Sequence, residues 1–151
     1  MSLEKHLADT VEHRQKVQQI LASFIAELTQ RSIHHDDTKF EEPEAPLFAE
    51  VVDQLATLTY NSPKYKECLE KLKPALDHHY AKNTHHPQHY QDGIDGMDLM
   101  DLVEMIADWK ASTERHNTGN IDKSMEVNRT RFKIDDQLYK ILQNTVERYL
   151  K

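Results

Sequence analysis

The sequence has few of the residues on which several common kinds of site depend. Glycine occurs three times in 151 residues, which argues against glycine-rich phosphate loops and against many tight hairpins. The single cysteine, Cys68, rules out an internal disulfide and favours a reducing compartment. No apolar run approaches the roughly 20 residues that span a bilayer, and the first residues form no signal-like apolar stretch. We therefore expect a cytoplasmic protein without a membrane partner.

Positive charge is also scarce. Nineteen lysines and arginines face 26 acidic residues, and the formal net charge is −7. Such a surface repels phosphate backbones, so long nucleic acid is disfavoured as a partner. Charged residues make up 30% of the chain and hydrophobic residues 38%, which is typical of a globular protein of one domain. We expect residues 1–151 to form that domain, and a homodimer is compatible with the sequence.

Helical periodicity runs through the chain. Residues 3 to about 30 place apolar side chains at three- and four-residue spacing, which predicts one long amphipathic helix. Further helices are predicted over residues 47 to about 60, from Pro63 behind a capping Ser62, over 98 to about 115, and in two pieces within about 121–151. No alternating strand pattern is present. The sequence predicts an all-α fold.

Histidine is abundant where other residues are scarce. Ten histidines occur, and seven of them fall within residues 34–35 and 78–89. Imidazole binds metals and titrates near neutral pH, so such clusters suit a metal site or an acid–base site. A surface cluster or a purification tag is the alternative, although a tag is contiguous and terminal.

The pair His35 and Asp36 sets an imidazole beside a carboxylate, a combination that Zn²⁺, Mn²⁺, Fe²⁺ and Co²⁺ accept. His13, on the apolar stripe of the first predicted helix, is either another ligand or a core histidine bonded to a backbone carbonyl. Asp101, Glu104 and Asp108 share one helix face. That face is either a solvated acidic surface or a further source of ligands, and for Asp101 we expect the solvated surface.

These residues resemble the HD superfamily of metal-dependent phosphohydrolases. Members are helical and hold their metal with a histidine on an early helix, an adjacent His-Asp pair and an aspartate on a later helix. The resemblance implies an HD-like helical bundle, with ligands His13, His35, Asp36 and Asp108. It also implies one or two divalent ions, chosen from Mn, Fe, Co, Ni, Zn and Mg.

A closer resemblance is to an uncharacterised family of phages and bacteria with three ordered motifs. The motifs stand here as HDDTKF at 35–40, HYAKNTHHP at 79–87 and EMIADW at 104–109. With His13, this resemblance covers residues 10 to about 115, and the C-terminal third matches nothing that we can name.

The histidines between the first and last motifs suggest a larger site than one metal needs. In two-metal HD proteins such histidines hold the second ion, which would give that role to His79, His85 and His86; helix capping and loop structure are the alternative. His78 and His89 are expected at the surface. Lys39 either contacts a substrate phosphate or neutralises nearby acids, and Glu104 is expected to orient a ligand histidine.

The resemblance implies hydrolysis of a small phosphorylated molecule, such as a nucleotide. Metal ions would polarise the phosphoryl oxygens and activate water, and His79 or His85 would protonate the leaving oxygen. Two other functions stay open. One is a di-iron oxygenase built on the same centre, and the other is a non-enzymatic module that binds a nucleotide or a protein.

Overall fold

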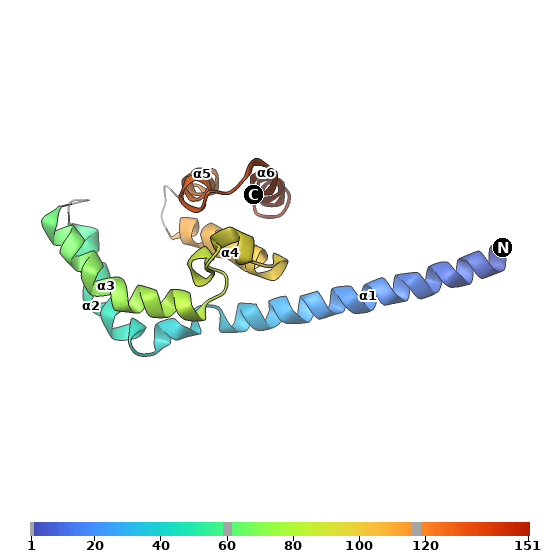
Figure 1. Ribbon diagram of the computed structural model, residues 1–151, viewed down its shortest axis with the longest axis horizontal. Helices are drawn as coiled ribbons and strands as arrows, with labels where there is room; N and C mark the ends of the chain where they lie inside the picture. Colours follow the sequence, from blue (N-terminus) through green and yellow to red (C-terminus); the bar gives the residue numbers. More distant parts are fainter. Residues whose placement is uncertain (1, 59–61, 116–118) are drawn as a thin grey trace. The chain divides into compact units, whose positions relative to one another are not determined.

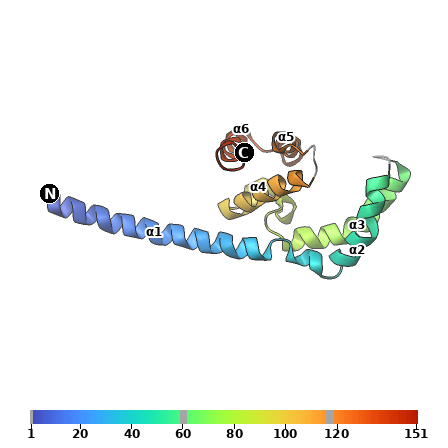
Figure 2. The same ribbon diagram turned by 180° about the vertical axis from the view of Figure 1, so that it is seen from behind.

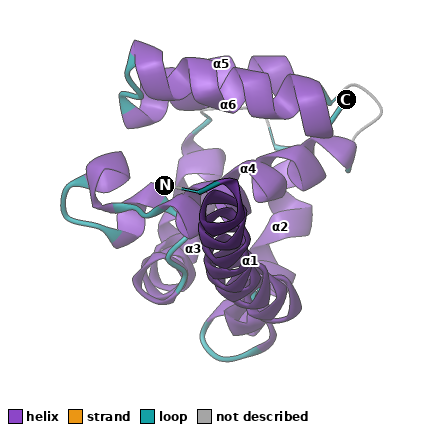
Figure 3. Ribbon diagram, turned by 90° about the vertical axis from the view of Figure 1, so that its right-hand side faces the viewer, coloured by secondary structure: helices purple, strands orange, loops and turns teal. Residues whose placement is uncertain are grey.

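The computed structural model describes residues 2–58, 62–115 and 119–151, and the chain divides into two units that meet between His35 and Asp36. Helices are the only regular secondary structure in these described ranges, as Figure 3 shows. The all-α prediction is confirmed. No helix among the described residues is long and apolar enough to cross a membrane.

The first unit is a single long helix, α1, which spans Leu3–His34. It begins where the side chain of Ser2 accepts a hydrogen bond from the backbone nitrogen of Lys5 (3.2 Å). It runs four residues past its predicted end. No residue of α1 is buried. The predicted apolar stripe is therefore present, but no other element of this unit packs on it.

The second unit opens with a helical hairpin. A 3-10 turn, η1 (Asp37–Phe40), leads into α2 (Glu44–Thr57), and α3 (Pro63–Lys82) packs against α2. The two helices lie side by side in Figure 1. Ser62 caps α3 as predicted, because its side chain accepts a hydrogen bond from the nitrogen of Tyr65. Val51, Cys68 and Leu72 form the buried centre of the hairpin.

The rest of the second unit surrounds a larger core. Two 3-10 turns, η2 (Pro87–His89) and η3 (Gly93–Gly96), precede α4 (Leu99–Glu114), α5 (Ile121–Phe132) and α6 (Asp136–Tyr149). These three helices lie together in Figure 2. Their apolar faces meet in one cluster whose fully buried members include Met105, Met125 and Val146. α4 therefore has one face in this core and another available to a site.

Candidate metal centre

Asp36 opens the second unit in an unusual backbone conformation. Its φ of 60° lies in the left-handed region, which aspartate tolerates better than most residues. Asp36 is the residue before η1, so this bend sets the direction in which η1 begins. One carboxylate oxygen, Oδ2, lies 2.6 Å from Nζ of Lys39, and the other, Oδ1, is directed toward the second histidine cluster. Lys39 thus neutralises this acid, which is one of its two predicted roles.

Three histidines converge on Asp36 Oδ1. His79 comes from the last turn of α3, and His85 and His86 come from the loop that follows. Nε2 of His79 lies 3.3 Å from this oxygen, and Nε2 of His85 lies 3.5 Å from it. Nε2 of His86 is 2.9 Å from Nε2 of His79. One ligand atom from each of the four residues lies within 4.8 Å of the others, so their lone pairs share one small volume.

Two carboxylates fix the outward-facing ring nitrogens. Nδ1 of His79 donates to Oε2 of Glu44 at 2.9 Å, and Nδ1 of His85 lies 3.1 Å from Oε1 of Glu104. A carboxylate that accepts from Nδ1 leaves the lone pair on Nε2, the arrangement that metal-ligating histidines use. Each of these histidines is therefore held with Nε2 toward the cluster. The Glu104 contact is the one that its predicted orienting role requires.

The ionisation of the cluster favours cation binding. Burial alone would raise the pKa of Asp36, but the close approach of His79, His85 and the Lys39 ammonium group outweighs it and holds that pKa well below its usual range. Burial lowers the pKa of His86 to about 3, helped by the proximity of the His85 and His79 imidazoles. At neutral pH the cluster thus presents an ionised carboxylate and a neutral imidazole, the forms that bind metals.

A short polar network supports His79 from behind. The side-chain nitrogen of Asn83 donates to the carbonyl of His79 (2.8 Å) and to Oγ1 of Thr38 (2.9 Å). Oγ1 of Thr38 in turn lies 3.2 Å from Nδ1 of His79. Because Thr38 belongs to η1 and Asn83 caps α3, this network joins the Asp36 segment to the histidine segment.

The donor set fits a divalent transition metal. Three imidazole nitrogens and one carboxylate oxygen are the ligands that Zn²⁺, Mn²⁺, Fe²⁺ and Co²⁺ share. The histidines are oriented from outside, and His79 and His85 are each at most 3% exposed. Asp108, which is half-buried on α4, offers a carboxylate oxygen within 4.8 Å of one from Asp36.

The remaining predicted ligands lie in the first unit. His35 is its last residue and precedes Asp36 in the chain. His13 is exposed and lies about 32 Å from the end of α1, because the unbroken helix rises 1.5 Å per residue. The structure therefore does not bring His13 and His35 together within one chain. Their ligand roles stay predictions.

Sequence reasoning missed Glu44 and placed three residues wrongly. Glu44 is fully buried, accepts from both His78 and His79, and follows two acids and a proline, a run that indicated either a loop or the start of a helix. His78 and His89 were expected at the surface, but both are half-buried. Nδ1 of His78 lies 2.8 Å from Glu44, and Nδ1 of His89 lies 2.9 Å from the carbonyl oxygen of Tyr80. Asp101 was expected on a solvated face but is 1% exposed. It accepts from the hydroxyl of Tyr90 (2.6 Å), and that bond ties it into the fold.

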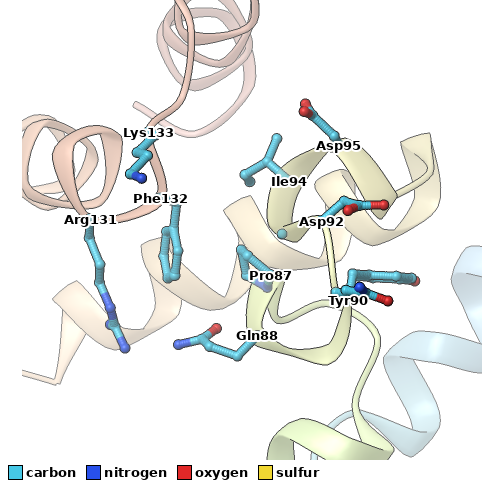
Figure 4. A pocket seen from close by; sticks show the side chains of 11 residues that line it. Pro87, Gln88, Tyr90, Asp92, Ile94, Asp95, Arg131, Phe132 and Lys133 are labelled. Carbon is cyan, nitrogen blue, oxygen red and sulfur yellow. The ribbon is translucent and has the colours of Figure 1, made fainter.

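A pocket is lined in part by Pro87, which follows His86 of the cluster in the chain. It has a volume of about 390 Å³ and lies between the segment from Pro87 to Asp95 and the end of α5 (Figure 4). Asp92 and Asp95 line one side and Arg131 and Lys133 the other. Its walls thus carry charges of both signs close to Pro87, the residue that follows His86.

Comparison with known proteins gives one match. The model of a family described as "Family of unknown function (DUF5662)" matches residues 2–148. No curated protein and no solved structure matches the chain.

Proposed function

The chain belongs to the family of unknown function DUF5662, and from that premise we propose that it is a cytoplasmic, divalent-metal-dependent phosphohydrolase. Its substrate in this proposal is a nucleotide or another small phosphoester. The observation that carries the proposal is the convergence of Asp36, His79, His85 and His86, with ligand atoms within 4.8 Å of one another. Buried imidazoles oriented by carboxylates are costly to build without a charge to bind.

The residues of the cluster would serve mainly as metal ligands. Asp36, His79, His85 and His86 would hold the ion, with Asp108 beside Asp36. When bound, such an ion polarises a phosphoryl oxygen and makes water a stronger nucleophile. His79 and His85 are better placed as ligands than as general acids, because both are buried with Nδ1 on a carboxylate.

Lys39 is placed to meet a substrate. Its side chain is 38% exposed, whereas that of its partner Asp36 is 14% exposed, so the ammonium group lies at the solvent side of the pair. A phosphate oxygen that approached the cluster would meet this charge. Lys39→Met is expected to raise KM more than it lowers kcat.

The pocket beside Pro87 is where we place the organic part of the substrate. Arg131 and Lys133 would meet an anionic group, and the guanidinium of Arg131 lies over the ring of Phe132, 4.8 Å from its centroid (Figure 4). Arg131→Ala should raise KM about tenfold with little change in kcat, because it removes one charge-assisted contact. Arg148→Ala, outside the pocket, serves as the matched control. An unchanged KM in Arg131→Ala would remove the pocket from the proposal.

The first experiment measures metal content and hydrolysis together. The untagged protein is purified without added metal, analysed by elemental mass spectrometry, and titrated with Mn²⁺ before assays on a panel of nucleotides and phosphoesters. His79→Ala should bind metal on the order of 100-fold more weakly or worse and lose turnover, whereas the control His89→Gln should retain both. Wild-type metal content and turnover in His79→Ala would refute the assignment.

A second candidate function uses the same ligands. Iron accepts a set of imidazoles and carboxylates as readily as zinc does, so the cluster also suits oxygen chemistry. Oxygen consumption by the iron-loaded protein, without phosphoester turnover under Mn²⁺ or Zn²⁺, would favour the oxygenase. Tight nucleotide binding without turnover under any metal would favour a binding module.

A further inference from the structure

The first unit carries more exposed apolar surface than an isolated helix in water should keep. Nine large apolar side chains of α1 each expose 40% to 72% of their area, and no residue of the helix is buried. At roughly 80–100 Å² for each, they present on the order of 800 Å², the area that one partner contributes to a standard protein interface. Exposed patches of this size mark surfaces that another molecule covers.

The apolar residues follow a heptad spacing. Leu7, Leu21 and Leu28 repeat at seven-residue multiples, and Leu3, Val17 and Phe24 fill the alternate positions, so six of the nine seam positions between residues 3 and 31 are apolar. A repeat of this kind, sustained over four heptads, is what one helix needs to pack along another. The seam therefore fits a second helix better than a flat surface.

Length argues for a second copy of the helix as the occupant. α1 has 32 residues and so is about 48 Å long. A compact unit the size of residues 36–151 is about 35 Å across, so it would leave one end of the helix uncovered even if the helix lay along it. Another α1 matches the seam over its whole length.

Charge selects the direction of pairing. Arg14 and Arg31 occupy seam positions, so parallel helices in register would place each arginine against its own copy at a cost in free energy. Antiparallel helices avoid this. They set Leu3 against Leu28 of the partner subunit and Leu7 against Phe24 of the partner subunit, while His6 comes near Glu27 of the partner subunit.

We propose that α1 is a dimerisation helix, whose apolar seam packs antiparallel on the α1 of a second copy of this chain. The inference uses residues of the first unit alone and is independent of the proposed hydrolase activity. Five of the nine exposed apolar residues lie in the seam, and Val11, Ile20 and Ile25 flank it, so pairing of the two helices would remove much of this area from water.

The test is the mass of the full chain in solution. Sedimentation equilibrium is measured for wild type, for Leu21→Glu/Phe24→Glu in α1, and for the control Val127→Glu, which changes an exposed apolar residue of α5 (66% exposed). We expect a dimer for wild type and for Val127→Glu. The α1 double variant should dissociate at least about 100-fold more readily, because two carboxylates replace buried apolar side chains.

Two outcomes overturn the proposal. In the first, the wild type stays monomeric at a concentration of about 100 µM. In the second, the double variant remains as dimeric as the wild type. Circular dichroism checks that the double variant keeps its helix content.

Pairing direction is tested by oxidation of single-cysteine variants in a Cys68→Ala background. A mixture of Leu3→Cys and Leu28→Cys should form a disulfide-linked dimer, and Leu3→Cys alone should not. Efficient linkage of Leu3→Cys alone would overturn the antiparallel arrangement.

Discussion

At the residue scale, Glu44 has the clearest single task. It is completely buried and accepts from Nδ1 of both His78 and His79. Burial tends to raise the pKa of this acid, but hydrogen bonds from His78, Thr38 and His79 hold it below its ordinary value. The charged form of Glu44 is thus the form that orients His79.

Removing that charge should weaken the site without removing a ligand. We expect Glu44→Gln to lower metal affinity by about 10- to 100-fold, the usual effect of losing the partner of a ligand histidine. Competition with a fluorescent chelator measures the affinity. Glu41→Gln, an exposed neighbour, should bind like wild type, and equal losses in both variants would contradict the orienting role.

Tyr90 gives a residue-scale prediction in alkaline solution. Burial and the hydrogen bond to Asp101 raise the pKa of Tyr90 to about 12, above the ordinary value of about 10. The folded state therefore favours the protonated phenol. The stabilisation is complete below about pH 10 and is lost as pH rises toward 12.

We expect Tyr90→Phe to be less stable than wild type at pH 8, with the difference shrinking by pH 11. Urea unfolding at several pH values measures it. Tyr149→Phe, at an exposed position (75%), should track wild type throughout. A gap for Tyr90→Phe that stays constant with pH would count against the assignment.

At the element scale, the start of α4 determines where Glu104 and Asp108 lie. Asp98 caps the helix by accepting from the nitrogens of Met100 and Asp101, and Oδ2 of Asp101 accepts from the nitrogen of Asp98. Asp98→Ala should cost about 1 kcal/mol, as lost caps do. Asp101→Ala should cost about 2–3 kcal/mol, because it also leaves the Tyr90 hydroxyl without its acceptor.

Chemical unfolding of the two variants, with the exposed Asp95→Ala as control, tests this order. If Asp98→Ala proved the more destabilising change, the buried contact of Asp101 with Tyr90 would carry less than the cap. If Asp95→Ala matched either, the capping box would not be the cause.

Local signals predicted the helices, and the histidine content together with the family resemblance pointed to the residues of the cluster, but neither predicted the contacts among them. Ser62 before Pro63 is a cap that needs only its own neighbours, so the start of α3 could be read from sequence. The burial of Glu44 depends on α3 packing across α2, and that of Asp101 on Tyr90 eleven residues away. Such pairings depend on tertiary structure, which composition and periodicity do not encode.

At the scale of the whole molecule, metal binding and folding of the second unit should be linked. The cluster joins the segment before η1, the end of α3 and the loop before η2, and Glu104 brings in α4. An ion that binds only the folded state stabilises it by about 2.7 kcal/mol at 100 times the dissociation constant. EDTA should therefore lower the thermal midpoint of wild type.

The control for this link between metal binding and folding is a variant that cannot bind the metal ion. The midpoint of His79→Ala should be the same with Mn²⁺ and with EDTA, because no site remains to be filled. A similar rise with Mn²⁺ in both proteins would point to nonspecific binding by the acidic surface.

The position of Trp109 allows the site to be observed directly. It is the sole tryptophan of the sequence, it is buried on α4, and its ring stacks on that of Phe132 with centroids 6.2 Å apart. The same helix carries Glu104 and Asp108 on another face. Excitation of the indole at long ultraviolet wavelength thus gives an optical signal from one known position. A cation that binds to the carboxylates of α4 should change the fluorescence emission of Trp109. Binding of a quenching ion such as Co²⁺ could be followed by this emission without any added dye.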